Sequence, residues 1–110
     1  MNCCGEGRDS ASPGASGPTM TLETQQKFHD FLKSANAPGT LDARTKRLVA
    51  IALSVLARCE PCVKIHIAKA REMGLSEAEI DEAAWMAIAF GGSPAMMFFN
   101  EAKKELGGRG

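Results

Sequence analysis

A nearly unbroken apolar segment in the middle of the chain constrains the fold more than any other feature. Residues 48–57 carry one polar side chain, that of Ser54. Pro38-Gly39 precede the segment, and Thr40 or Asp42 can cap a helix that continues to about Arg58. A helix with so little polar surface must be buried on nearly all sides, so we expect it at the centre of a helical domain.

The rest of the chain carries helix start and stop signals, and no segment shows the strict alternation of a strand. We expect further helices from about Thr21 to Ala35, from Pro61 to Gly74, from the capping box at Ser76–Glu79 to Gly91-Gly92, and from Ser93-Pro94 to about Leu106. The predicted fold is therefore all-α, a bundle of about five helices.

The N-terminal segment has a different composition. Gly, Ser, Pro and Ala dominate residues 5–18, and such a segment cannot bury enough apolar surface to offset the entropy lost on ordering. We therefore expect a disordered tail at 1–19, which includes Cys3 and Cys4, and a folded domain at 20–110.

Charge and composition exclude several kinds of partner. Lys plus Arg and Asp plus Glu balance at 13 each, and aromatic residues make up 5% of the chain, so neither a basic patch nor a stacking surface for nucleic acid is expected. The apolar runs are shorter than the roughly 18 residues that cross a bilayer. The N-terminus lacks the apolar core of a signal peptide, so we expect a soluble protein in the reducing cytoplasm, without a membrane partner.

Four consecutive large apolar residues point to self-association. Met96-Met97-Phe98-Phe99 must face all directions around a helix. A domain of this size cannot easily cover that surface together with the apolar helix at 48–57, so a homo-oligomer is expected. An unusually apolar core within one chain is the alternative.

The candidate site is Cys59-Glu60-Pro61-Cys62 with His66. On a helix these cysteines and the histidine lie within roughly 60° of one another. His66 follows Cys62 by one turn and could act as a base for its thiol or stabilise its thiolate. Cys59 lies where the chain enters the helix, and unpaired amides there also favour a thiolate. Helical positions three apart hold their Cβ atoms about 5 to 6 Å apart, more than a relaxed disulfide allows, so pairing requires local adjustment.

Other interpretations of the cysteine pair have weaker support. A zinc site would take Cys59, Cys62 and His66 but lacks a fourth ligand nearby. A covalent haem requires His directly after the second Cys, where Val63 stands. Two small core cysteines and a core histidine that merely share a helix form the structural alternative. We expect no cofactor and no metal.

Several motifs beyond the cysteine pair support a family resemblance. They are Leu48-Val49-Ala50-Ile51-Ala52, Cys59-Glu60-Pro61-Cys62 with His66, Ala70, Gly74-Leu75-Ser76, Glu79-Ile80 and Gly91-Gly92. Through them the run from Leu41 to Leu106 resembles the alkylhydroperoxidase D and carboxymuconolactone decarboxylase superfamily.

The resemblance implies an all-helical protein, assembled as a trimer or hexamer, that reduces hydroperoxides and is reset by an external dithiol. It makes Cys62 the peroxidatic cysteine, Cys59 the resolving cysteine and His66 part of a proton relay. The decarboxylase branch lacks the cysteine pair, so decarboxylation is disfavoured. Thiol-disulfide exchange or redox sensing without peroxide turnover is one alternative function, and a non-catalytic helical oligomer that binds a metal or small ligand is another.

One position departs from the peroxidase branch of that superfamily. The branch places a Glu twelve residues before the first cysteine, and this chain has Arg47 there. A cation cannot accept the relayed proton, although it could lower the pKa of a nearby thiol. Arg47 could equally be a solvated charge on the polar edge of its helix, and Glu60 is a weak substitute because it points to a different face.

Overall fold

The computed structural model describes residues 13–107, with side chains from residue 21 onward. Residues 1–12 of the tail expected at 1–19, which include Cys3 and Cys4, lie outside the described residues. Residues 13–19 of that tail belong instead to the first helix.

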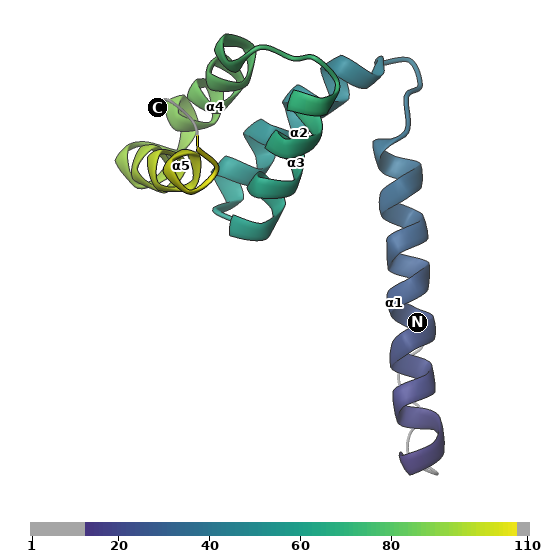
Figure 1. The fold of residues 1–110 in the computed structure, drawn as a ribbon. Helices are drawn as coiled ribbons and strands as arrows, with labels where there is room; N and C mark the ends of the chain where they lie inside the picture. The colour runs from purple at the N-terminus through teal and green to yellow at the C-terminus, as the bar shows by residue number, and fades with distance from the viewer. Residues whose placement is uncertain (1–12, 108–110) are drawn as a thin grey trace. The chain divides into compact units, whose positions relative to one another are not determined.

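The all-α prediction is confirmed for residues 13–107, which form five helices and no strand (Figure 1). The helices are α1 (Pro13–Asn36), α2 (Ala43–Ala57), α3 (Glu60–Glu72), α4 (Glu77–Gly91) and α5 (Ser93–Glu105). None of these helices combines the length and apolar character needed to cross a membrane.

The contacts divide the chain into two units between Ala37 and Pro38. The first unit contains α1, which begins at Pro13, eight residues before the expected start at Thr21. Phe28 and Phe31 on this helix hold their ring centroids 6.3 Å apart, because positions three apart on a helix are neighbours.

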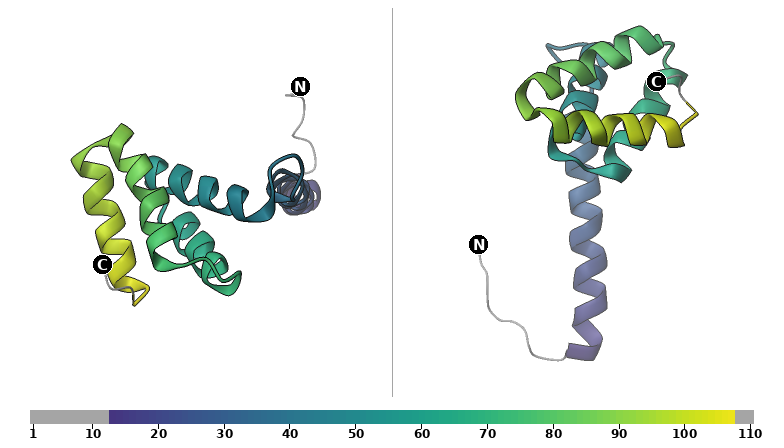
Figure 2. Two further views of the ribbon diagram at one scale, coloured as in Figure 1. Left: turned by 90° about the horizontal axis from the view of Figure 1, so that it is seen from above. Right: turned by 90° about the vertical axis from the view of Figure 1, so that its left-hand side faces the viewer.

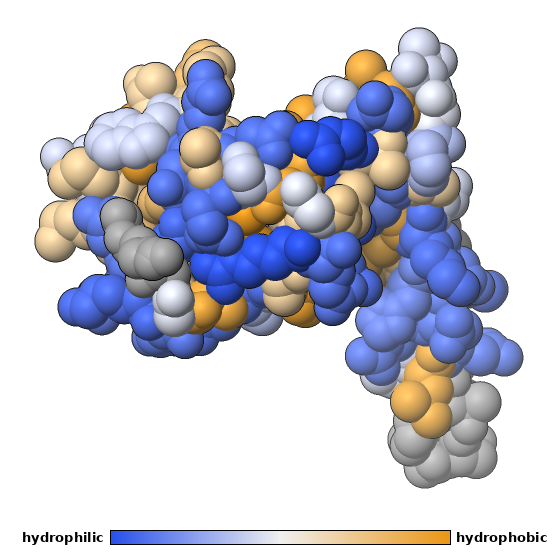
Figure 3. Space-filling view, turned by 45° about the horizontal axis from the view of Figure 1, so that its top comes forward, coloured by the Kyte–Doolittle hydropathy of each residue, from blue (hydrophilic) through white to orange (hydrophobic). Residues whose placement is uncertain are grey.

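The second unit is the helical bundle α2–α5. α2 packs along α3 and α4, and α5 lies mainly beside α4 (Figure 2). The core consists of buried apolar side chains from these helices and from the connection between α3 and α4, namely Ile51, Val55, Val63, Ile67, Ala70, Leu75, Ile80, Ala84, Ala87, Ile88, Ala95, Phe99 and Ala102. Charged and polar side chains dominate the face drawn in Figure 3, with apolar side chains visible between them.

Local hydrogen bonds set where the helices begin. The Asp42 carboxylate accepts from the Thr45 amide at 2.8 Å and caps α2. Ser76 and Glu79 form a complete capping box at the start of α4, as their spacing predicts. These caps satisfy amides that the first helical turn leaves without partners.

α2 is not buried all round within one chain, so that expectation is wrong. Ile51, Ser54 and Val55 are buried, whereas the side chains of Val49, Leu53 and Leu56 are 45%, 59% and 41% exposed. α3 and α4 cover only part of the helix surface, and the remaining apolar surface faces outward.

A buried cation lies on α5. Lys103 is 2% exposed, and its Nζ lies 2.6 Å from Asp81 Oδ1 and 3.2 Å from Glu77 Oε1. It also lies 5.4 Å from the centre of the Phe99 ring. Two carboxylates and an aromatic face therefore compensate the burial of this charge.

Candidate redox site at the start of α3

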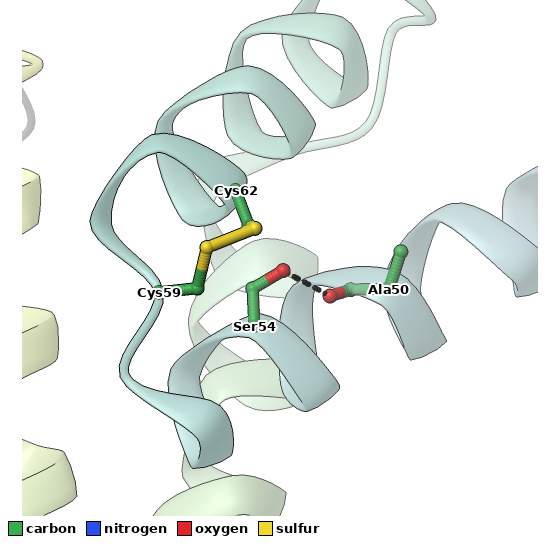
Figure 4. The surroundings of a disulfide bond; sticks show 4 residues. All are labelled: Ala50, Ser54, Cys59 and Cys62. Carbon is green, nitrogen blue, oxygen red and sulfur yellow. Dashed lines mark hydrogen bonds between the residues drawn. A yellow bond between two sulfur atoms is a disulfide. The ribbon is translucent and has the colours of Figure 1, made fainter. Parts of the chain in front are cut away.

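A disulfide joins Cys59 and Cys62 (Figure 4). Cys62 belongs to the first turn of α3, but Cys59 is the N-cap and has extended backbone angles, φ −97° and ψ 103°. The two Cα atoms are 5.2 Å apart, inside the usual range of about 4.4 to 6.8 Å. The sequence interpretation placed Cys59 at the entry to the helix and expected a local adjustment for pairing, and the extended backbone of this N-cap is that adjustment.

The turn between α2 and α3 presents Cys59 to the site. Arg58 adopts the left-handed conformation, φ 54°, and ends α2. The Cys59 amide then donates to the Ser54 carbonyl at 3.1 Å, and the Cys59 carbonyl accepts from the Val63 amide at 3.0 Å. Pro61 occupies the first turn of α3, where its missing N–H loses no helical hydrogen bond.

The N-terminus of α3 makes this end of the site electrostatically positive. Cys59 makes no side-chain cap hydrogen bond, so first-turn amides are free to act on a nearby anion. Cys59 and Cys62 are both half-buried. A thiolate at either position would be stabilised by the helix dipole and remain accessible to a small reactant.

Ser54 is a site residue that the sequence interpretation missed. It is buried, and its Oγ donates to the Ala50 carbonyl at 2.7 Å. Its side chain lies beside the disulfide, with the hydroxyl directed to the Ala50 carbonyl (Figure 4). The signal was available, because Ser54 is the one polar residue in the apolar run at 48–57.

His66 and Arg47 contact each other across the α2–α3 seam. Arg47 Nη1 lies 2.6 Å from His66 Nδ1, and both residues are half-buried. Arg47 Nε is buried and has no hydrogen-bond partner. Arg47 is therefore not a solvated charge on a polar edge, because it reaches into the site.

The surroundings of His66 keep its imidazole neutral. Partial burial, the positive charge of Arg47 and that of Lys69 together lower the pKa of His66 below its usual value near 6.5. The structure brings His66 to Arg47, one turn along α3 from Cys62.

Glu60 does not take the place of the missing carboxylate. Its Oε2 lies 2.9 Å from Lys64 Nζ, and its side chain is 57% exposed. It belongs to a surface ion-pair cluster that also contains Glu105. Within residues 13–107, no three His, Cys, Asp or Glu side chains converge in a way that could hold a metal ion.

A second feature lies between α2 and α4. A shallow cleft of about 530 Å³ is lined by Leu48, Val49, Ala52, Leu53, Glu79, Glu82, Ala83 and Met86. At about 100° per residue, Val49 and Leu56 lie roughly opposite Arg47 and Ser54 around α2. One side of this helix therefore faces the disulfide, while the other presents an apolar surface.

Two curated relatives, both uncharacterized, match the chain over 75 residues. Uncharacterized protein 4 in the cox locus of Paracoccus denitrificans is 36% identical, with 68% of each chain covered. A protein of Cupriavidus necator is 32% identical, with 68% of this chain and 66% of the relative covered.

Solved structures show the same fold. A carboxymuconolactone decarboxylase family protein of Thermotoga maritima, for which a part in the antioxidative response has been suggested, superposes with a TM-score of 0.68 at 30% identity, covering 72% of this chain and 81% of that one. A family member from Legionella pneumophila gives a TM-score of 0.71 at 30% identity, covering 82% and 80%.

The sequence pattern of the carboxymuconolactone decarboxylase family matches residues 23–105, which include α2–α5 and the disulfide. This match agrees with the resemblance carried by the cysteine motif and its flanks. The chain belongs to the carboxymuconolactone decarboxylase family.

Proposed function

We propose that this protein is a thiol-disulfide oxidoreductase that cycles Cys59 and Cys62 between dithiol and disulfide. The observation that carries the proposal is the half-buried disulfide at the positive N-terminus of α3. Arg47 and His66 contact each other between α2 and α3, one helical turn beyond Cys62. A structural disulfide would not require a charged guanidinium beside the same helix.

Hydroperoxides are the oxidants that we propose, with Cys62 as the attacking cysteine and Cys59 as the resolving one. The Cys62 thiolate attacks the terminal peroxide oxygen, the O–O bond breaks, and Cys62 becomes a sulfenic acid. The alkoxide that leaves takes up a proton from water and becomes an alcohol. The Cys59 thiol condenses with the sulfenic acid, releasing water and forming the disulfide. An external dithiol then supplies two electrons and two protons and is itself oxidised to a disulfide.

The suggested antioxidative role of the Thermotoga maritima protein supports hydroperoxides as oxidants. Exchange with dithiols without peroxide turnover is the second candidate, and one observation favours it. Arg47 occupies the position where a carboxylate would complete a proton relay, and a guanidinium cannot accept a proton.

The test compares single cysteine variants of the full chain. Reduced wild-type protein is mixed with tert-butyl hydroperoxide in a stopped-flow instrument, and thiol loss and peroxide loss are followed. Cys62→Ser should abolish peroxide consumption, whereas Cys59→Ser should consume about one equivalent and then stop, because the sulfenic acid cannot be resolved. Cys3→Ser and Cys4→Ser make the same change outside the Cys59-Glu60-Pro61-Cys62 motif and serve as controls.

Full peroxide turnover in both Cys62→Ser and Cys59→Ser would refute the redox function. If the wild type consumes no peroxide but its disulfide exchanges with dithiothreitol, the second candidate holds.

We also propose that a second copy of the chain covers the apolar face of α2 and α4. Leu53 and Met86 in the cleft are 59% and 60% exposed, and Phe90, which lines an adjoining hollow with them, is 81% exposed. Monomers rarely leave large apolar side chains this exposed side by side. A self-complementary contact would bury them in a homo-oligomer.

A further inference from the structure

The Arg47–His66 contact determines where the proton of the imidazole sits. A guanidinium stays protonated at any physiological pH and can only donate hydrogen bonds. At 2.6 Å from Arg47 Nη1, His66 Nδ1 must therefore be the acceptor. A neutral imidazole whose Nδ1 accepts carries its proton on Nε2.

This assignment limits what His66 can do for the cysteines. The lone pair that a base would use is occupied by Arg47, and the other nitrogen already carries a proton. His66 can donate a hydrogen bond from Nε2 but cannot take a proton from Cys62 without breaking the contact with Arg47. Its expected role as a base is therefore replaced by that of a neutral donor.

We infer that Arg47 is a positioning residue that locks His66 as an Nε2–H donor, so that the site favours thiol-disulfide exchange over peroxide reduction. The inference about reaction preference rests on the proposed redox function; the inference about the tautomer rests on the contact alone.

Leaving groups explain the preference. When an external thiolate attacks the disulfide, the S–S bond breaks and its electron pair stays on a cysteine sulfur. A thiolate leaves without being protonated, and the positive field around α3 stabilises it. When the Cys62 thiolate attacks a hydroperoxide, an alkoxide leaves and takes up a proton. A His66 that had taken up the thiol proton could return it to the alkoxide as imidazolium, but Arg47 holds the Nδ1 lone pair, so the proton must come from water.

The charges that act on the ring agree with a neutral His66. Arg47 from α2 and Lys69 from α3 both disfavour imidazolium, and partial burial adds to their effect on the pKa. Arg47 Nε is buried without a hydrogen-bond partner, so the guanidinium could donate one more hydrogen bond.

The tautomer can be read directly by long-range ¹H–¹⁵N correlation NMR on histidine-labelled protein. The chain has two histidines, so His29→Gln assigns the spectrum. We expect wild-type His66 to be neutral and protonated on Nε2 at pH 7, in both the oxidised and the dithiothreitol-reduced protein. Arg47→Lys should keep this form because ammonium is also donor-only. Arg47→Glu should move the proton to Nδ1, because a carboxylate accepts from it.

Arg44→Met is the matched control, since it removes a cation from the same helix, one that pairs with Glu79 at 2.7 Å. It should leave the His66 spectrum unchanged. A wild-type His66 that is protonated on Nδ1, or charged at pH 7, overturns the inference, as does an Arg47→Glu variant with an unchanged tautomer. If Arg47→Glu does not fold, the His66 tautomer can still be measured by NMR in the wild type and in Arg47→Lys.

The reaction preference is measured as the ratio of two rate constants, one for peroxide reduction by reduced protein and one for disulfide reduction by dithiothreitol. Arg47→Glu should raise this ratio at least about tenfold, because a positioned acid-base group contributes on the order of 10² or more. Adding His66→Gln to Arg47→Glu should remove the gain, since an amide cannot transfer the proton.

A ratio that does not rise in a variant whose tautomer has moved refutes the preference. Absence of both reactions in every variant would refute the proposed function while leaving the tautomer result standing.

Discussion

The Cys59 amide donates a hydrogen bond to the Ser54 carbonyl across the turn that ends α2. This bond ties the first cysteine of the pair to buried Ser54 in the last turns of α2. Because Ser54 itself is held by Ala50, the position of Cys59 depends on the packing of α2. The redox pair is thus anchored to the core, although its two residues lie on a turn and a first helical turn.

Ser54 offers a test of that anchoring. Ser54→Ala removes a hydroxyl that donates to a carbonyl already inside a helix, so the free energy of unfolding should change by less than about 1 kcal/mol. Ser54→Leu must fit extra carbons beside the disulfide and should destabilise the protein by about 1 to 3 kcal/mol. Urea unfolding monitored by circular dichroism measures both. Equal stability of the leucine variant and the wild type would show that the space beside the disulfide is not closely packed.

The buried cation on α5 should contribute strongly to stability. Lys103→Ala creates a cavity and leaves Asp81 without its 2.6 Å partner, so we expect a loss of about 2 to 3 kcal/mol. The estimate stays below that for a fully buried pair because the Asp81 side chain is 36% exposed and can be hydrated. Lys104→Ala, at a side chain 74% exposed, should change the free energy of unfolding by no more than about 0.5 kcal/mol. Comparable losses in the two variants would contradict this account of Lys103.

Glu77 predicts a specific acid dependence of stability. A hydrogen bond from Arg71, and then one from Lys103, lower its pKa from 4.5 to about 2 in the folded protein. A carboxyl whose pKa is lowered on folding favours the folded state when ionised. Its contribution is complete above about pH 4.5 and is lost as the pH falls toward 2.

The difference in the free energy of unfolding between wild type and Glu77→Gln should therefore shrink between pH 5 and pH 2. The Glu77 side chain is 44% exposed, so solvent screening keeps the effect modest. Glu72→Gln, on an exposed residue of α3, is the control. A difference that stays constant over this pH range would show that Glu77 does not titrate as the ion pairs require.

The apolar face of α2 and α4 can be tested through the oligomeric state. Leu53→Glu and Met86→Glu each place a charge in the proposed contact between copies, and both should convert the oligomer into smaller species. Ile65→Glu makes a similar change at a side chain 53% exposed on α3, outside that face, and should leave the assembly intact. Light scattering coupled to size-exclusion chromatography measures the mass. A wild-type protein that is monomeric at micromolar concentration would refute the contact.

Several features followed from local sequence signals alone. The positions of α2–α5 were predicted from caps, breakers and the apolar run, because Asp42, Ser76 and Pro61 act within one helical turn. The cysteine motif with His66 was identified as the candidate site by spacing. These properties depend on neighbouring residues, so no knowledge of packing was needed.

Tertiary structure decided what these residues can do. Arg47 and His66 are 19 positions apart, and their contact exists because the turn at Arg58 folds α3 back along α2. The same packing buries Ser54 beside the disulfide, surrounds Lys103 with two carboxylates and leaves one side of α2 exposed. Sequence spacing determined which groups are available; the hydrogen bonds and burial that set their proton positions arise only when distant helices meet.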